Sequence, residues 1–276
     1  MGFDEAAKDA IAKNPAGGDW LHLNAVSVLG PNRWYEGGDV RFHPDNLICS
    51  SRQCNLVFII EKKTGRLVWK VGPDYLTDSR LRELGQIIGQ HHAHMIPKGL
   101  PGEGNILLFD NGSFGGYGMP TGSSPDGVNR ERRHYSRVLE FNPVTLKIIW
   151  EYVGDRLPNG KIMVMGAQRM FSPFISSAQR LPNGNTLIDQ GADGIFLEVT
   201  SEGETVWEFV NPIPKKRAPD SIRYSVYRAY RAPYEWIPQL ARPDEIPVSP
   251  PKIETYRVPG ALPFGDPKGV TTKICL

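Results

Sequence analysis

Histidines gather in two short segments of this chain. The sequence contains six histidines, and four of them fall in these segments: His22, His91, His92 and His94. Imidazole titrates near neutral pH and can serve as a nucleophile, a general base or a metal ligand. Some of these rings could instead satisfy backbone groups in a protein core. Because buried imidazoles need hydrogen-bond partners, the clustering favours a functional site.

A metal site is one alternative for the second segment. His92 and His94 form a His-x-His pair, and in a strand both side chains project to one face, in a geometry common for zinc or copper. No third ligand can be assigned from the sequence. The glycine-rich stretch 112–118 lacks the lysine and the strand-turn-helix context of a phosphate loop. We therefore expect neither a metal nor a cofactor.

The elements that would position the histidines repeat along the chain. Short apolar or alternating runs bounded by turn residues predict three sets of four strands: 20–28, 46–52, 56–61 and 67–71; 91–96, 105–111, 137–141 and 148–153; 176–181, 185–190, 195–199 and 205–210. Each fourth strand carries a tryptophan, Trp69, Trp150 or Trp207. A content of 29 glycines and 24 prolines suits tight turns between strands. The pattern predicts an all-β propeller of four-stranded antiparallel blades, with a β-sandwich as the alternative.

The repeat also predicts the domain organisation. We expect a single propeller domain over residues 1–276, with blades at about 20–73, 89–154 and 174–212, a partial blade from 225 and an irregular tail over 236–276. Propellers typically close with 4–8 blades, so the propeller is expected to be incomplete in this chain. Either further blades precede it, or the chain self-associates through an open blade edge.

The first strand of each blade lines the channel of a propeller, so its start is where side chains from several blades meet. His22, His91, Ser176 and Tyr227 begin the four expected inner strands. We expect these four side chains to face one cavity. Asn24 and His94 lie on the same strands, and we expect them to contact substrate together with Ser176 and Tyr227.

At these positions the sequence resembles the arylsulfotransferase family, whose members do not use the nucleotide sulfate donor PAPS. The resemblance is carried by five motifs: Asp-Trp-x-His-x-Asn at 19–24, Gly-Gln-His at 89–91, Phe-Asp-Asn-Gly at 109–112, Tyr-Ser-Arg at 135–137 and Leu-Pro-Asn-Gly-Asn at 181–185. It spans roughly residues 19–233. The last motif alone is a generic blade turn.

The resemblance implies a six-bladed propeller that moves a sulfuryl group from an aryl sulfate to a phenol through a sulfated histidine. It further implies that His22 and His91 hold the sulfate and that Arg137 assists. Two departures stand out. The arginine expected soon after Phe-Asp-Asn-Gly is missing from residues 113–118, and no histidine follows His134, so the nucleophilic histidine of the family has no identifiable counterpart.

Charge and hydropathy exclude other classes of function. The formal net charge is +2, and no run of lysine or arginine is dense enough to track phosphates, so we expect no nucleic-acid partner. No stretch approaches the ~20 apolar residues of a membrane helix. Residues 1–15 lack the pattern of a signal peptide, whereas relatives are often periplasmic or secreted, so the compartment stays open. The alternative function is a propeller that binds ligands or proteins without turnover.

Overall fold

The computed structural model describes residues 5, 9, 13, 19, 21–76, 78–113, 115–117, 128–154, 170–218, 221–242 and 244. Trp20, expected to begin the first strand, and the tail beyond 244 lie outside these residues. The chain divides into two units, Met1–Arg231 and Ala232–Leu276. In the second unit the described part contains the 3-10 helix Tyr234–Trp236. The expected single domain over residues 1–276 stays a prediction.

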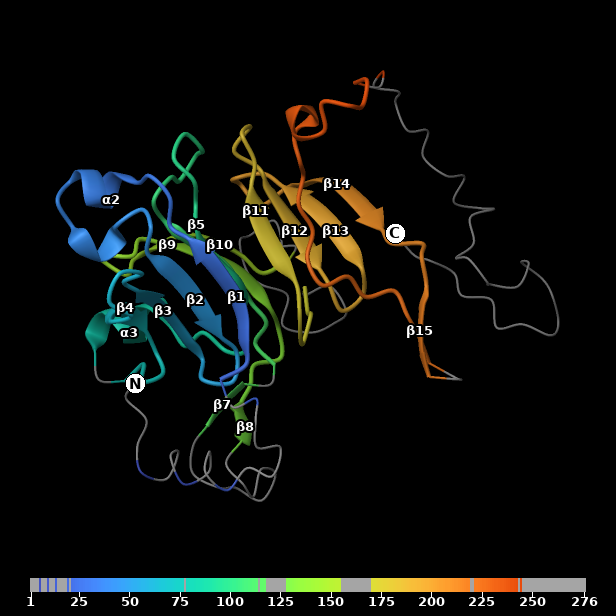
Figure 1. Ribbon diagram of the computed structural model, residues 1–276. Helices are drawn as coiled ribbons and strands as arrows, with labels where there is room; N and C mark the ends of the chain where they lie inside the picture. The colour runs from blue at the N-terminus through green and yellow to red at the C-terminus, as the bar shows by residue number, and fades with distance from the viewer. Residues whose placement is uncertain are drawn as a thin grey trace. The chain divides into compact units, whose positions relative to one another are not determined.

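Three four-stranded antiparallel sheets build the first unit (Figure 1). Blade 1 consists of β1 Leu23–Val28, β2 Leu47–Ser51, β3 Leu56–Ile60 and β4 Leu67–Val71; blade 2 of β5 His91–Met95, β6 Ile106–Asp110, β9 Arg137–Phe141 and β10 Ile148–Tyr152; blade 3 of β11 Ser177–Arg180, β12 Thr186–Gln190, β13 Ile195–Val199 and β14 Thr205–Val210. Within each sheet the strands follow one another in chain order. The protein is an all-β propeller of four-stranded blades, as predicted, and it is incomplete.

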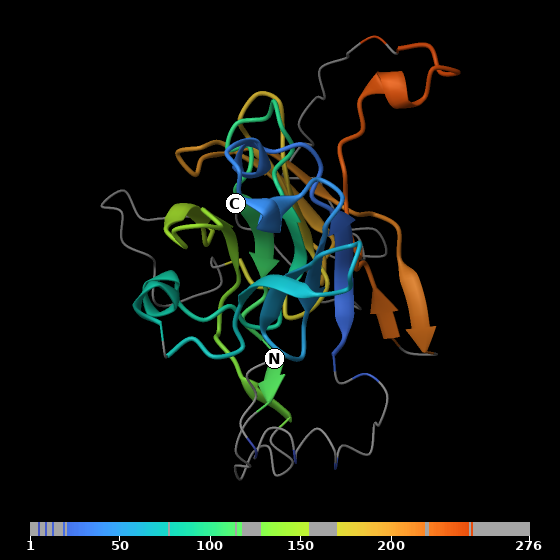
Figure 2. The same cartoon turned by 60° about the vertical axis from the view of Figure 1, so that its left-hand side comes forward.

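Shorter elements surround the blades. They are the helices α2 Arg33–Glu36 and α3 Ser79–Leu84, the 3-10 helix Val40–Phe42, and two hairpins formed by β7 Gly115–Tyr117 with β8 Val128–Glu131 and by β15 Lys215–Ala218 with β16 Ser221–Arg223. The strands expected from the sequence do not include residues 115–117 or 215–218. Both segments instead contribute strands, because a two-stranded ribbon needs backbone pairing but no apolar alternation. The β7–β8 hairpin extends away from the three blades in both views (Figures 1 and 2).

Apolar side chains on facing sheets form the cores between blades. Between blades 1 and 2, Ile59 and Trp69 pack in one cluster with Leu108 and other buried residues. Between blades 2 and 3, Phe109 and Ile188 belong to a second cluster. The middle strands are apolar on both faces because each sheet has a neighbour on both sides in a propeller.

The tryptophan of the fourth strand joins each blade to the next. Trp69 of blade 1 donates its Nε1–H to the carbonyl of Pro143, at 2.8 Å, in the β9–β10 turn of blade 2. Trp150 of blade 2 donates in the same way to the carbonyl of Ser201, at 2.8 Å, in the β13–β14 turn of blade 3. Both acceptors occupy the second position after the preceding strand ends. Trp69 and Trp150 therefore link neighbouring blades through their fourth strands.

Candidate functional site

His91 is the first residue of β5 and is almost completely buried, with 2% exposure. Its Nδ1 lies 2.7 Å from Asn111 Oδ1, and the backbone N–H of Ile175 donates to its Nε2 at 3.2 Å. The Asn111 amide donates to the carbonyls of Ser172 and Ile175, so its oxygen must face the ring. The proton of neutral His91 therefore resides on Nδ1, and both ring nitrogens are engaged.

Burial determines the charge of His91. The pKa of His91 is lowered to about 3: removal from water is the largest cause, the hydrogen bond to Asn111 opposes it, and the charges of Arg52 and His22 add to the lowering. His91 is therefore neutral near pH 7. A neutral imidazole can shape the site and position neighbouring groups, but it brings no positive charge to an anion.

His22 lies immediately before β1, in a left-handed backbone conformation with φ of 43°. Its Nδ1 lies 2.5 Å from a carboxylate oxygen of Asp19, and the side-chain exposure of His22 is 38%. A carboxylate accepts the Nδ1–H and leaves the Nε2 lone pair free to react or to accept a proton. The sequence had given Asp19 no role, although the three-residue spacing between the two groups is visible in it.

Asn24 binds the residue before His91, and Tyr227 contacts the His91 ring. The Asn24 amide donates to the carbonyl of Gln90 at 2.6 Å, which ties the start of β1 to the start of β5. The Tyr227 hydroxyl and the Arg228 guanidinium both donate to the carbonyl of Asn24, each at 3.1 Å. The Tyr227 ring stands edge-on to His91, with centroids 6.3 Å apart. The structure therefore brings His91, Asn24 and Tyr227 together.

Ser176 lies beside this group but uses its hydroxyl within the wall. It is 1% exposed. Its Oγ donates to Ser172 Oγ at 2.8 Å and accepts the N–H of Gly191 at 3.0 Å, while its backbone N–H donates to the Tyr227 carbonyl. The expected contact of Ser176 with substrate stays a prediction.

His94 belongs to a separate group. Its Nδ1–H donates to the carbonyl of His92 at 3.0 Å, and the two rings stack at 4.4 Å. The Tyr230 hydroxyl lies 2.8 Å from His92 Nε2. Burial lowers the pKa of both histidines. Within the described ranges, no three or more His, Cys, Asp or Glu side chains gather in a way that could hold a metal ion.

Arg137 is buried in an ion-pair network away from these contacts. Its Nε donates to Asp110 at 2.7 Å and its Nη1 to Glu151 at 2.9 Å, and its Nη2 faces the carbonyls of residues 84–86. Burial acts to lower the pKa of Arg137, but the two carboxylates outweigh it and raise the pKa. These contacts indicate that Arg137 holds blade 2 together. Its expected assistance in holding sulfate stays a prediction.

Arg52 is a residue that the sequence analysis missed. It follows β2, and its backbone N–H donates to the carbonyl of His22 at 3.0 Å. The side chain is half-buried, and among the described residues no carboxylate forms an ion pair with it. Burial lowers its pKa, and the charge of Asp19 partly opposes this. Strand pairing could have revealed this residue. Because β1 and β2 are antiparallel, Arg52, directly after β2, lies next to His22, directly before β1.

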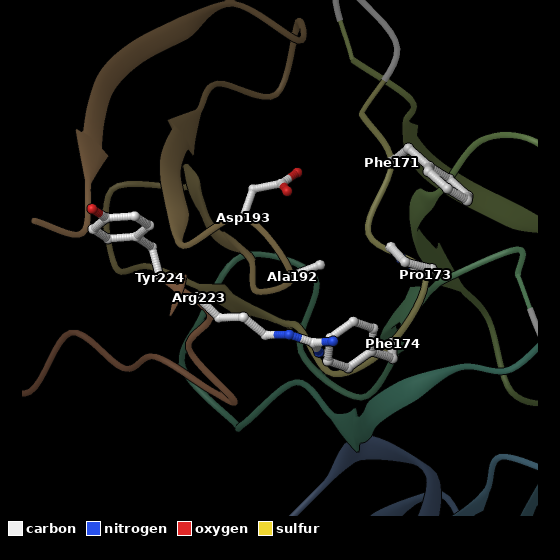
Figure 3. A pocket seen from close by; sticks show the side chains of 7 residues that line it. All are labelled: Phe171, Pro173, Phe174, Ala192, Asp193, Arg223 and Tyr224. Atoms are coloured by element: carbon white, nitrogen blue, oxygen red, sulfur yellow. The ribbon is translucent and has the colours of Figure 1, made fainter. Parts of the chain in front are cut away.

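Two neighbouring cavities open beside the loop that leads into β11. The first has a volume of about 540 Å³ and is lined by Phe171, Pro173, Phe174, Ala192, Asp193, Arg223 and Tyr224 (Figure 3). The Arg223 guanidinium carbon lies 5.9 Å from the centroid of the Phe174 ring. The second cavity, of about 570 Å³, shares Phe171 and Pro173 with the first. Phe174 directly precedes Ile175, whose N–H binds His91. None of the expected cavity residues His22, His91, Ser176 and Tyr227 lines either cavity.

Comparison with known proteins finds similar solved structures but no curated relative. No curated protein matches it. Among solved structures, a protein of unknown function from Bacteroides caccae is similar at 15% identity and a TM-score of 0.33. The match covers 61% of this chain and 43% of that structure, so this chain spans less than half its length. No helix in the described ranges is long and apolar enough to cross a membrane.

One further comparison identifies the family. The family model described as Arylsulfotransferase (ASST) matches residues 3–228, which is well over half of the chain. The match agrees with the propeller fold and with the motifs around His22 and His91. The chain belongs to the arylsulfotransferase family.

Proposed function

We propose that this protein transfers a sulfuryl group from an aryl sulfate to a phenol and that His22 is the nucleophile. The observation that carries this choice is the contact between Asp19 and His22 Nδ1, which leaves Nε2 with a lone pair. His91 is a weaker candidate, because both of its ring nitrogens are engaged.

The reaction balances without a cofactor. In the first step Nε2 of His22 attacks sulfur, an N–S bond forms, the bond between sulfur and the aryl oxygen breaks, and a phenolate leaves. In the second step the acceptor phenol attacks sulfur, the N–S bond breaks, and His22 is regenerated. The proton lost by the acceptor phenol neutralises the phenolate formed first. Asp19 stabilises the positive charge on the ring while the N–S bond exists.

The neighbouring residues form the wall of the site. Neutral His91 holds the Ile175 backbone, and Asn24 links β1 to β5. Tyr227 covers the His91 ring edge-on. In this proposal these groups fix the position of His22 relative to substrate, and Arg137 takes no part because its donors are already used.

The cavity in Figure 3 provides a place for the aromatic part of a substrate. Phe171, Phe174 and Tyr224 offer ring faces and edges, and Arg223 adds a cation above Phe174. Such a lining suits a flat aromatic ring with an anionic substituent. The cavity therefore supports an aryl sulfate or a phenol as the class of ligand.

A second candidate function is ligand binding without turnover. The occupied nitrogens of His91 and its pKa of about 3 favour this alternative, because they leave only one reactive imidazole in the site. It predicts saturable binding of aryl sulfates with no release of phenol.

The test is release of a chromogenic phenol from its aryl sulfate in the presence of a second phenol. The wild-type protein should turn over, and His22→Ala should lose more than about 100-fold in rate. Intact-mass spectrometry after a pulse of donor should show one added SO₃ on the wild type and none on His22→Ala. His43→Ala is the matched control and should behave as the wild type. Equal turnover by His22→Ala would reject His22 as nucleophile, and binding without turnover by the wild type would favour the second function.

A further inference from the structure

A sulfate monoester needs positive charge in its binding site, and the histidines do not supply it. Burial lowers the pKa of His91, His92 and His94, so these rings are neutral near pH 7. Arg137 is paired with Asp110 and Glu151. The cation that holds the sulfate oxygens must therefore come from elsewhere in the site.

Arg52 lies where such a cation is needed. Its N–H binds the carbonyl of His22, which places the two residues side by side at one end of blade 1. The preceding residue, Ser51, accepts a hydrogen bond through its carbonyl from Gln90 at 3.1 Å, and Gln90 directly precedes His91. Arg52 is thus fixed by its backbone between the two histidines that carry the family motifs.

The surroundings of the guanidinium also suit an anion. It is half-buried, and the nearby carboxylate of Asp19 is bound to His22 rather than to Arg52. A partly desolvated cation without an ion pair is costly, and an anion that enters beside it recovers this cost. The charge of Arg52 reaches into the site, since it is one of the causes that lower the pKa of His91.

We infer that Arg52 binds the sulfate group of the substrate through its guanidinium and orients the sulfur atom towards His22. This inference rests on the proposed function for its mechanism, but the anion site itself does not require turnover. A guanidinium can present two N–H groups to two oxygens of a tetrahedral anion, which fixes orientation as well as charge. Charge that builds on the sulfuryl oxygens during transfer is stabilised by the same contacts.

Two other arginines compete with Arg52 for the anion. Arg223 lines the cavity at Phe174, and Arg228 lies beside Asn24. Arg228 Nη2 donates to the Asn24 carbonyl and its Nη1 to the Tyr230 hydroxyl at 3.4 Å, so these contacts hold it to the channel wall. Arg52 has no such contacts from its side chain in the described part of the chain. This difference selects Arg52 over Arg228 as the residue that is free to bind an incoming anion.

The experiment compares Arg52→Met and Arg52→Lys with Arg66→Met. Arg66 is an exposed arginine in the β3–β4 turn, at the opposite end of the same blade, and serves as the matched control. Two readouts are used on each folded variant: binding of inorganic sulfate by titration calorimetry, and KM and kcat for a chromogenic aryl sulfate.

Arg52→Met should weaken sulfate binding by at least about 10-fold, which corresponds to about 1.4 kcal/mol, and should raise KM and lower kcat. Arg52→Lys should recover part of the binding but less of kcat, because an ammonium group lacks the two-pronged geometry. Arg66→Met should match the wild type.

The outcomes separate this inference from the proposed function. If the wild type binds sulfate without turnover and Arg52→Met loses that binding, the proposed function fails and the Arg52 site stands. Equal sulfate binding by Arg52→Met and the wild type would overturn the inference. The same holds if the wild type binds no sulfate, or if Arg228→Met abolishes binding while Arg52→Met retains it. Where Arg52→Met fails to fold, Arg52→Lys decides, because unchanged KM and sulfate affinity in that variant would also overturn the inference.

Discussion

The face of blade 2 that meets blade 3 differs from the far face of blade 3, although equivalent positions of the repeat form both faces. Counting from Gly-Asn before the second strand, Phe109 of blade 2 corresponds to Asp189 of blade 3. Trp150 corresponds to Trp207, because each is the third residue of the fourth strand in its blade. Phe109 is fully buried between blades and Trp150 donates to Ser201, whereas Trp207 is 41% exposed. A repeated tryptophan becomes a link between blades only where a neighbouring blade supplies the acceptor.

The outer face of blade 3 carries Leu187, Asp189, Phe196, Trp207 and Phe209, and it has no partner blade among the described residues. Leu187 and Asp189 are buried, so the open part of this face is the one around Trp207 and Phe209. Phe209 is 46% exposed and stacks on Trp207. Alternation along β12 points Ile188 towards blade 2 and Asp189 towards this face. The self-association that the sequence suggested would use a surface of this kind, and it stays a prediction.

Truncation of the tryptophans should give the largest contrast. Trp69→Ala should lower the free energy of unfolding by about 3–5 kcal/mol, because it removes a buried side chain and its bond to Pro143. Trp207→Ala should cost about 1 kcal/mol or less, since the ring is already exposed. Urea denaturation of both variants measures the difference. Equal losses would show that the outer face of blade 3 is packed as tightly as the interface between blades.

Asp189 should make stability depend on pH. It is 1% exposed, and neither carboxyl oxygen has a hydrogen-bond partner among the described residues. Burial raises its pKa from 3.8 to about 7. In the unfolded chain the group ionises above pH 3.8, and in the folded protein it resists ionisation until about pH 7. Asp189 therefore destabilises the folded state least below pH 3.8, and its destabilising effect grows as the pH rises from 3.8 towards 7.

Asp189→Asn should remove this dependence. With about 1.4 kcal/mol for each unit of pKa, the variant should gain up to about 4 kcal/mol over the wild type at pH 8 and little or nothing at pH 4. Asp193→Asn is the matched control, because its carboxyl is exposed in the turn after the same strand. Unfolding free energies measured between pH 4 and pH 8 decide the point. A wild-type profile parallel to that of Asp189→Asn would mean that Asp189 has a charged partner.

The fold could be predicted from the sequence because its signals are local. Alternation, turn residues and one tryptophan in each fourth strand predicted strand positions close to those observed, for example 137–141 for β9. The histidine segments were found for the same reason. Arg52 was missed because its position beside His22 arises from pairing of β1 with β2. The resemblance to the family implied that Arg137 assists with the sulfate. Its ion pairs with Asp110 and Glu151 could not be predicted, because these partners come from separate strands and no sequence pattern links them.

The smallest effect isolates the hydrogen bond that joins blades. Trp150→Phe keeps most of the aromatic surface but removes the Nε1–H that Ser201 accepts, so it should cost about 1 kcal/mol. Trp207→Phe is the matched variant, and it should leave the free energy of unfolding unchanged within about 0.5 kcal/mol, since no carbonyl in the described part of the chain accepts its indole N–H. Both substitutions replace the two fused rings of an indole with one phenyl ring. The difference between their effects on the free energy of unfolding therefore reports the hydrogen bond rather than the loss of surface. A loss of about 1 kcal/mol or more in Trp207→Phe would show that this indole is also bonded, and the contrast between the two faces would then lie in Asp189 alone.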